Sequence, residues 1–278
     1  MLPSIHEAQA YGRACLSSSI SPDIDIQYLL CHLLDCSPTR LLLDAESDLT
    51  ESQWQQFKQF IERRKNGEPI AHITGSRGFW SLELDVNDST LIPRPDTELL
   101  VALALAKVEA GMKIIDLGTG SGAIALSIAD ERPDITMFAT DFHLPAVQLA
   151  QANARKHILN NVHFMQAFWL TACQQNQFDM VISNPPYIEA DDPHLQQGDV
   201  RFEPLSALIS GLDGLDDIRL ITQQAANCLR PNGWLLVEHG YDQSVAVQQL
   251  FSAAGFSHIS AHQDFGGNDR AVMGQLTL

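Results

Sequence analysis

The chain has 278 residues, 45% of them hydrophobic, which is enough for one full α/β domain and a smaller second one. Its formal charge of -17 at pH 7 argues against a nucleic-acid backbone as the main partner, because phosphate binding requires clustered Lys and Arg. The five cysteines form no Cys-x-x-Cys pair and the ten histidines show no ligand spacing, so neither disulfides nor a metal site are expected. With no leader and no apolar run of membrane-spanning length, the sequence predicts a cytoplasmic protein without a membrane partner.

The N-terminal part carries the signals of a small helical bundle. Ser21 and Pro22 precede a run of apolar residues at helical spacing, as an N-cap and a first-turn proline do. Thr50 and Gln53 have the capping-box spacing that opens another helix. Breaker glycines and an alternating pattern around residues 79–86 then predict a hairpin. The sequence thus predicts three parts, which are a bundle over residues 1–75, a hairpin connector over 76–92 and a larger domain over 93–278.

The larger domain alternates strand and helix patterns. A helical run is expected over residues 96–108, and two C-terminal strands are expected over 256–261 and 271–276. Alternation of this kind predicts a doubly wound α/β sheet, which binds ligands at the carboxyl ends of its strands. Candidate parallel strands are the apolar runs at 113–117, 135–140, 162–166, 178–183 and 234–237.

A glycine-rich turn joins the first of these strands to a helix. Residues 118–122 read Gly-Thr-Gly-Ser-Gly, and glycines are needed where a backbone bends sharply and approaches a ligand. The spacing up to Ala123 also fits the dinucleotide fingerprint, and Asp141 ends the next strand where a ribose-binding acid is expected. Asp116 would repel a diphosphate but attract the sulfonium and ammonium groups of S-adenosylmethionine. The turn therefore predicts a nucleotide-type cofactor and favours S-adenosylmethionine.

A second motif, Asn184-Pro185-Pro186-Tyr187, follows the strand predicted at 178–183. The Asn side chain offers an acceptor and a donor, so it can read a planar group that presents an NH2. The prolines withhold N–H groups and leave carbonyl acceptors, while the tyrosine adds a flat face for stacking. Taken alone, the motif also fits an ordinary turn. Its place after a buried strand, beside a cofactor turn, predicts a clamp for an sp² nitrogen.

Together the two motifs resemble the S-adenosylmethionine-dependent methyltransferases that modify adenine N6, cytosine N4 or a protein glutamine amide. Residues 67–75, 91–98 and 196–204 further resemble one branch, the peptide chain release factor glutamine methyltransferases of the HemK type. The resemblance spans nearly the whole chain. It implies a Rossmann-like class I methyltransferase sheet that is closed by a C-terminal antiparallel strand.

The resemblance also implies an activity. The enzyme would transfer a methyl group from S-adenosylmethionine, releasing S-adenosylhomocysteine, to N5 of the glutamine in the Gly-Gly-Gln loop of class 1 release factors. This modification supports translation termination. A monomer is the default expectation. The loop over residues 188–210 and the N-terminal bundle are expected to form the surface that binds the release factor.

Cofactor contacts follow from the resemblance residue by residue. In the family an acid followed by Trp ends the third strand near the adenine, but here Phe168 stands in place of the acid and Trp169 matches. We therefore expect apolar packing in place of a hydrogen bond from the adenine amino group. Asp141 is expected at the ribose hydroxyls. The full set of implied cofactor residues is Gly118, Thr119, Gly120, Ser121, Gly122, Asp141, Trp169 and Asn184, with no metal ligand.

The chemistry expected at the clamp is orientation, because a primary amide is a poor nucleophile and no strong base lies near the motif. The Asn184 side-chain oxygen and the Pro185 carbonyl would accept hydrogen bonds from the amide NH2 and hold its nitrogen in line with the sulfonium methyl. Tyr187 would pack on the amide plane or shield it, so Asn184, Pro185 and Tyr187 are the expected catalytic residues. Pro186 joins them in binding the substrate.

Other residues carry weaker signals. Arg94, Asp96, Thr97 and Glu98 fit either a family motif or an ordinary helix start. The Glu238-His239 pair ends a predicted strand and is a candidate for the pocket wall.

Three rival functions remain open at the level of sequence. A DNA or RNA amino-methyltransferase shares the clamp and flips a base into it, but the acidic charge opposes this function. An NAD-dependent oxidoreductase fits the glycine spacing but finds no hydride-handling site elsewhere in the chain. A non-catalytic binding protein that retains the fold is the third.

Overall fold

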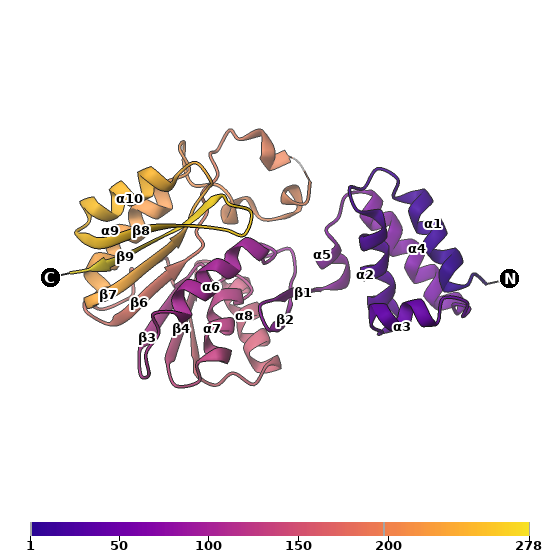
Figure 1. The fold of residues 1–278 in the computed structure, drawn as a ribbon, viewed down its shortest axis with the longest axis horizontal. Coiled ribbons are helices and arrows are strands. Elements are labelled where there is room, and N and C mark those ends of the chain that lie inside the picture. The colour runs from indigo at the N-terminus through magenta and orange to yellow at the C-terminus, as the bar shows by residue number, and fades with distance from the viewer. Residues whose placement is uncertain (1, 197, 278) are drawn as a thin grey trace. The chain divides into compact units, whose positions relative to one another are not determined.

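The computed structural model describes residues 2–196 and 198–277, and the chain forms two compact units (Figure 1). The first unit runs to Ser76 and also includes the short segment 198–202 from later in the chain. The second unit contains residues 77–196 and everything from Glu203 onward. Within the described residues, no helix is both long enough and apolar enough to cross a bilayer.

The first unit is a bundle of helices around its own apolar core. Capping boxes begin two helices, with Ser4 and Glu7 at one and Thr50 and Gln53 at the other, the second as the sequence predicts. Ser21 also precedes a helix, but its side chain makes no capping hydrogen bond. The core consists of side chains such as Leu29, Leu30 and Phe57, all fully buried. The helices are α1 (Ile5–Cys15), α2 (Pro22–Leu34), α3 (Pro38–Leu43), α4 (Glu51–Lys65) and α5 (Ile70–Thr74).

The segment 198–202 joins the bundle through ionic and polar contacts. The Arg64 guanidinium donates to Asp25 at 2.8 Å and to Asp199 at 3.1 Å. Arg201 donates to the backbone oxygen of Asn66 at 3.2 Å. Arg64 and Asp199 are far apart in the sequence, so only the folded chain reveals that they pair. The predicted bundle ends at residue 75 and therefore lacks the segment 198–202.

The second unit is built on a sheet with strand order β5-β4-β3-β6-β7-β9-β8. All neighbouring strands are parallel except at β9, which runs antiparallel to both β7 and β8. This is the doubly wound sheet with a C-terminal antiparallel strand that the sequence predicts. Its strands are β3 (Lys113–Leu117), β4 (Thr136–Asp141), β5 (Val162–Gln166), β6 (Phe178–Ser183), β7 (Leu229–Glu238), β8 (Phe256–Gln263) and β9 (Asp269–Leu276).

Helices cover both faces of this sheet, which explains why its strands are nearly continuous apolar runs. The consecutive residues Ile114 and Ile115 are both fully buried, and they belong to core clusters on opposite faces. Figure 1 shows α6, α7 and α8 on one face and α9 and α10 on the other. These helices are α6 (Glu98–Leu105), α7 (Ala123–Glu131), α8 (Leu144–Lys156), α9 (Asp216–Cys228) and α10 (Ser244–Ala253).

Some element bounds differ from the predicted ones. The hairpin consists of β1 (Ser76–Phe79) and β2 (Leu82–Asp85), so it begins at residue 76, as the predicted connector does, but before the alternating pattern around residues 79–86. It turns at Trp80, whose φ is 54°. The strand predicted at 234–237 is the end of the longer β7. The helical run predicted from residue 96 begins as a 3-10 turn, Pro95–Thr97, before α6. Each of these differences lies at an end of an element, where sequence patterns are weakest.

Candidate active site

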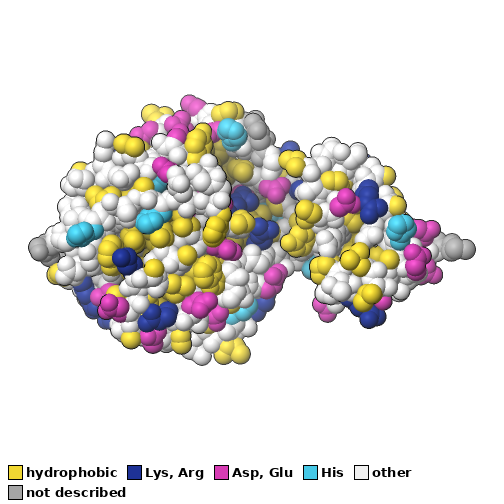
Figure 2. All heavy atoms as spheres, viewed as in Figure 1, with side chains coloured by type: hydrophobic (Ala, Val, Ile, Leu, Met, Phe, Trp, Pro, Cys, Tyr) yellow, Lys and Arg dark blue, Asp and Glu magenta, His cyan; other side chains and the backbone are white. Residues whose placement is uncertain are grey.

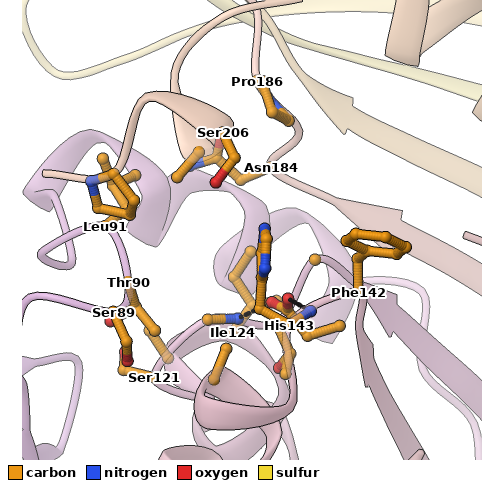
Figure 3. Close-up of a pocket in the computed structure, with 18 of the residues that line it drawn as sticks. Ser89, Thr90, Leu91, Ser121, Ile124, Phe142, His143, Asn184, Pro186 and Ser206 are labelled. Carbon is orange, nitrogen blue, oxygen red and sulfur yellow. Dashed lines mark hydrogen bonds between the residues drawn. The ribbon is translucent and has the colours of Figure 1, made fainter. Parts of the chain in front are cut away.

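A cavity of about 300 Å³ lies in the second unit at the carboxyl edge of the sheet. Its walls come from the turns after β3, β4, β5 and β6, from the segment before α6 and from residues 204–207. In Figure 3, Asn184, Pro186 and Ser206 lie at one end and Ser121 and Ile124 at the other. We call the first of these the asparagine end. The opposite end, lined by residues 118–121 and Asp141, is the glycine end.

The glycine turn follows β3, and each of its glycines has a left-handed backbone. The φ angles are 68° at Gly118, 55° at Gly120 and 90° at Gly122. At Gly118 a Cβ would lie 3.2 Å from the Trp169 ring, so the absent side chain lets the two pack together. At Gly122 a Cβ would lie 2.8 Å from Leu126. Gly122 does not line the cavity, and its missing side chain makes room for the first turn of α7.

Asp141 is held in place by backbone donors on both sides. The Gly120 N–H donates to its Oδ2 at 3.0 Å and the His143 N–H donates to its Oδ1 at 2.9 Å. The side chain lines the cavity, and each carboxylate oxygen retains a lone pair for a further donor. A fixed carboxylate of this kind suits a pair of ribose hydroxyls.

Asp116, in β3 behind the glycine turn, is almost completely buried at 1% exposure. Burial raises the pKa of this carboxyl to about 7, while a 2.7 Å hydrogen bond from the Thr119 hydroxyl opposes the rise. Asp116 does not line the cavity, but Thr119 does. A positive charge bound at the glycine end would favour the ionised form of this acid.

Aromatic side chains line the cavity after β5, where the resemblance leads us to expect an acid. Phe168 lines the cavity and is 44% exposed, and its ring meets that of Phe142 edge to face at 5.6 Å. Trp169 lies against Gly118, and its Nε1 donates to Asp217 at 3.1 Å. The glycine end therefore offers apolar and aromatic surface beside the Asp141 carboxylate.

At the asparagine end, Asn184 directly follows β6 and its side chain is fixed. Its Nδ2 donates to the Thr97 hydroxyl at 3.1 Å. Both Asn184 and Pro186 line the cavity, but Pro185 and Tyr187 do not. The Tyr187 hydroxyl instead donates to Glu238 at 3.4 Å, and burial, followed by the nearby Glu238 charge, raises the pKa of this phenol. The four motif residues therefore divide between the cavity wall and the layer behind it.

The structure also brings in residues that the sequence did not place at the cavity. Ser206 and Ala207 line it, although the loop over residues 188–210 was predicted only as a partner surface. The neighbouring Glu203 is buried and accepts from Arg94 at 2.6 Å and from the Ile92 N–H at 2.8 Å. These contacts join residues 91–98 to the segment that contains Glu203. In the sequence, the only sign of this pairing is that residues 91–98 and 196–204 both resemble stretches of the same family.

Across residues 2–196 and 198–277, no group of three or more His, Cys, Asp or Glu side chains could hold a metal ion. All five cysteines are free.

Comparison with known proteins identifies the family. The chain matches the family model described as "PrmC N-terminal domain" over residues 7–75 and the "Methyltransferase small domain" over residues 95–199. It is 49% identical over 261 residues to the release factor glutamine methyltransferase of Escherichia coli, with 94% of each chain covered. The chain belongs to the release factor glutamine methyltransferase family. The Salmonella typhimurium member is 47% identical, with coverage of 94% of this chain and 95% of its own.

The fold agrees with this family. A methyltransferase from Pyrococcus furiosus has a similar structure, with a TM-score of 0.56 at 14% identity over 78% of this chain and 98% of its own. The protein is therefore a methyltransferase of the class I fold, with S-adenosylmethionine as the methyl donor that fits its family. Membership in this family does not favour the oxidoreductase or the non-catalytic alternative.

Proposed function

We propose that this protein transfers a methyl group from S-adenosylmethionine to the side-chain amide nitrogen, N5, of the glutamine in the Gly-Gly-Gln loop of class 1 peptide chain release factors. The observation that carries the proposal is the Asn184 side chain, which lines the cavity after β6 with its nitrogen engaged by Thr97. Its oxygen is thereby left to accept a hydrogen bond from an NH2 group. The relatives named release factor glutamine methyltransferases cover almost the full chain and supply the identity of the acceptor.

The residues at the glycine end fit the cofactor. Asp141 would accept hydrogen bonds from the ribose hydroxyls, and the glycine turn, from Gly118 through Ser121, would pass around the methionine and ribose portions. Phe168 and Trp169 would provide apolar packing near the adenine. Gly122 would act through the backbone geometry of the turn and not by contact. The buried Asp116 fits a cationic ligand better than a diphosphate, because like charges repel strongly at low dielectric.

S-adenosylmethionine supplies an electrophilic methyl group on a sulfonium, and the protein supplies orientation. The Asn184 oxygen would accept from an N–H group of the glutamine amide and fix the direction of its nitrogen lone pair. The sequence predicts the Pro185 carbonyl as a second acceptor, but Pro185 does not line the cavity and is left out of the clamp proposed here. The same oxygen of Asn184 would stabilise the positive charge that grows on nitrogen during transfer. Pro186 would flank the amide from the cavity wall, and Tyr187 would support the clamp from behind through Glu238. The proton leaves to solvent after the transfer.

The release factor would bind to surfaces outside the cavity. The bundle over residues 1–75 and the loop over 188–210 would bind the release factor, while the hairpin over 76–92 connects the bundle to the catalytic domain over 93–278. The protein would act as a monomer in the cytoplasm, where release factors work, with no nucleic acid or membrane bound directly.

A DNA or RNA amino-methyltransferase is the rival with the same clamp. On the face shown in Figure 2, Lys and Arg side chains are scattered among Asp and Glu and form no continuous band. Together with the formal charge of -17, this surface does not favour a phosphate backbone. Family membership also points to a protein acceptor.

The test is a methyl-transfer assay with labelled S-adenosylmethionine and three separate acceptors. These are a purified class 1 release factor, the same factor with its loop glutamine changed to alanine, and duplex DNA. We expect label on the unmodified factor alone. Label on DNA would support the nucleic-acid alternative, and label on the alanine variant would place the methyl group on another residue.

A further inference from the structure

Thr97 occupies the N-cap position of α6 but does not cap it. A capping threonine has an extended backbone, but Thr97 ends the 3-10 turn Pro95–Thr97 with a helical one, at φ -67° and ψ -18°. Here the side chain makes no capping bond, although the residue is buried at 4% exposure. Its hydroxyl instead accepts from Asn184 Nδ2 at 3.1 Å. The helical backbone already continues through Thr97, so no cap is lost, and the hydroxyl is available to Asn184.

The other neighbour of this hydroxyl is a buried carboxylate. Glu238, the last residue of β7, is 2% exposed, and burial raises the pKa of its carboxyl to about 7, while a hydrogen bond from the Thr97 side chain opposes the rise. The Tyr187 hydroxyl donates to its Oε1 at 3.4 Å, and its Oε2 has no hydrogen-bond partner among the described residues. The groups whose charges act on it are Arg270 of β9, which attracts it, and Asp96, which repels it. Glu238 is therefore an acceptor surrounded mainly by donors.

The number of hydrogens on these groups decides which of them donates and which accepts in each hydrogen bond. A threonine hydroxyl has one hydrogen to donate, and the Glu238 carboxyl can only accept in its ionised form, which predominates above pH 7. Once Thr97 donates to Glu238, it can offer Asn184 only a lone pair. The nitrogen of the Asn184 amide must then face Thr97, and the oxygen must face the other way, toward the cavity.

We propose that Thr97 and Glu238 are positioning residues for the reaction, because together they select the rotamer of the Asn184 amide that presents its oxygen to the substrate. The inference rests on the proposed function, in which that oxygen accepts from a glutamine NH2. The nitrogen and oxygen ends of an amide have nearly the same size, so packing alone cannot choose between them. In the reversed rotamer, two NH2 groups would meet and the substrate would not be held.

The decisive variants differ only in the hydroxyl. Thr97→Val keeps the shape of the side chain and removes the hydrogen bond, whereas Thr97→Ser keeps the hydroxyl. For Thr97→Val we expect kcat on a release factor to fall roughly 10- to 100-fold, the range expected for one or two oriented hydrogen bonds. The dissociation constant for S-adenosylmethionine, measured by calorimetry, should change less than about twofold. Thr97→Ser should restore kcat to within roughly threefold of the wild type.

Thr222→Val is the matched control, because Thr222 is also buried and also loses one hydrogen bond, to the Ile218 carbonyl within α9. It should lower the melting temperature without lowering kcat, as a purely structural threonine would. Glu238→Gln provides a second route if Thr97→Val folds poorly. A Gln NH2 can donate to Thr97 and release the threonine hydrogen to the Asn184 oxygen, so kcat should fall at least roughly fivefold.

Unchanged kcat in Thr97→Val and Glu238→Gln would overturn the positioning role, as would a Thr97→Ser variant as slow as Thr97→Val. These outcomes are separate from a failure of the proposed function. In that case the wild-type protein itself would not methylate the release factor, while the calorimetric binding of S-adenosylmethionine could still be measured.

Discussion

The two ends of the cavity are assembled from the chain in different ways. The glycine end is lined largely by one continuous stretch, residues 118–121, and its acid is held by backbone N–H groups. At the asparagine end, Asn184 depends on Thr97 and Glu238, which belong to other segments of the chain. Backbone geometry fixes one end and side-chain hydrogen bonds fix the other. A substitution should therefore affect cofactor binding at the first end and catalysis at the second.

The largest expected effect is at the asparagine end. Asn184→Ala removes the acceptor that orients the substrate amide, and we expect kcat to fall at least roughly 1,000-fold, as for the loss of a group that stabilises developing charge. The dissociation constant for S-adenosylmethionine should stay within about threefold of wild type. Asn227→Ala, at an exposed position in α9, is the control and should leave both unchanged. Residual activity within tenfold of wild type would refute the clamp.

The next effect tests the glycine end. Gly118→Ala forces a side chain into a backbone with φ of 68° and brings it 3.2 Å from the Trp169 ring. We expect the dissociation constant for S-adenosylmethionine, measured by calorimetry, to rise roughly 10- to 100-fold. Gly111→Ala is a matched control, because φ is 78° there but no atom lies within 4 Å of the added Cβ. It should cost about 1 kcal/mol of unfolding free energy and leave cofactor binding intact. If both variants lost the same affinity for S-adenosylmethionine, backbone strain alone would explain the loss, and the contact with Trp169 would play no part.

Cofactor binding should also depend on pH through Asp116. Burial raises the pKa of this carboxyl to about 7 in the free protein, and a bound cation favours the ionised form and lowers that pKa. Binding therefore releases a proton below pH 7, so affinity should rise with pH up to about 7 and then level off. Between pH 6 and pH 8 we expect about a tenfold gain. Calorimetry in buffers of different ionisation enthalpy measures the released proton, and Asp116→Asn should abolish both the release and the pH dependence.

The smallest effect concerns the aromatic replacement of the family's acid. Phe168→Ala removes a ring that lines the cavity and packs against Phe142, and we expect affinity for S-adenosylmethionine to fall roughly threefold to tenfold. The matched control is Phe265→Ala, because that ring is 93% exposed and lies away from the cavity lining. No difference between the two variants would mean that the adenine does not use Phe168.

The contrast between the two ends also explains what could be predicted. The glycine turn and Asp141 were recognisable because their geometry depends on neighbours in sequence, such as a left-handed φ after a buried strand. In the sequence, Thr97 belongs only to an ambiguous helix start, and no local pattern connects Glu203 with Arg94. These two residues meet at 2.6 Å although they lie far apart along the chain. No local pattern encodes such a contact.

By itself, the sequence determined the alternation of strands and helices, the cofactor turn and the position of Asn184 after a buried strand, because each depends on local backbone preference or hydrophobic period. Only the tertiary structure decided which way the Asn184 amide faces, since that depends on the single hydroxyl hydrogen of Thr97 and the buried carboxylate of Glu238. The tertiary structure also places Gly122 outside the cavity wall, where its missing side chain leaves room for Leu126. The physical reason is the same in each case, because hydrogen bonds and steric contacts between distant segments exist only once the sheet has brought those segments together.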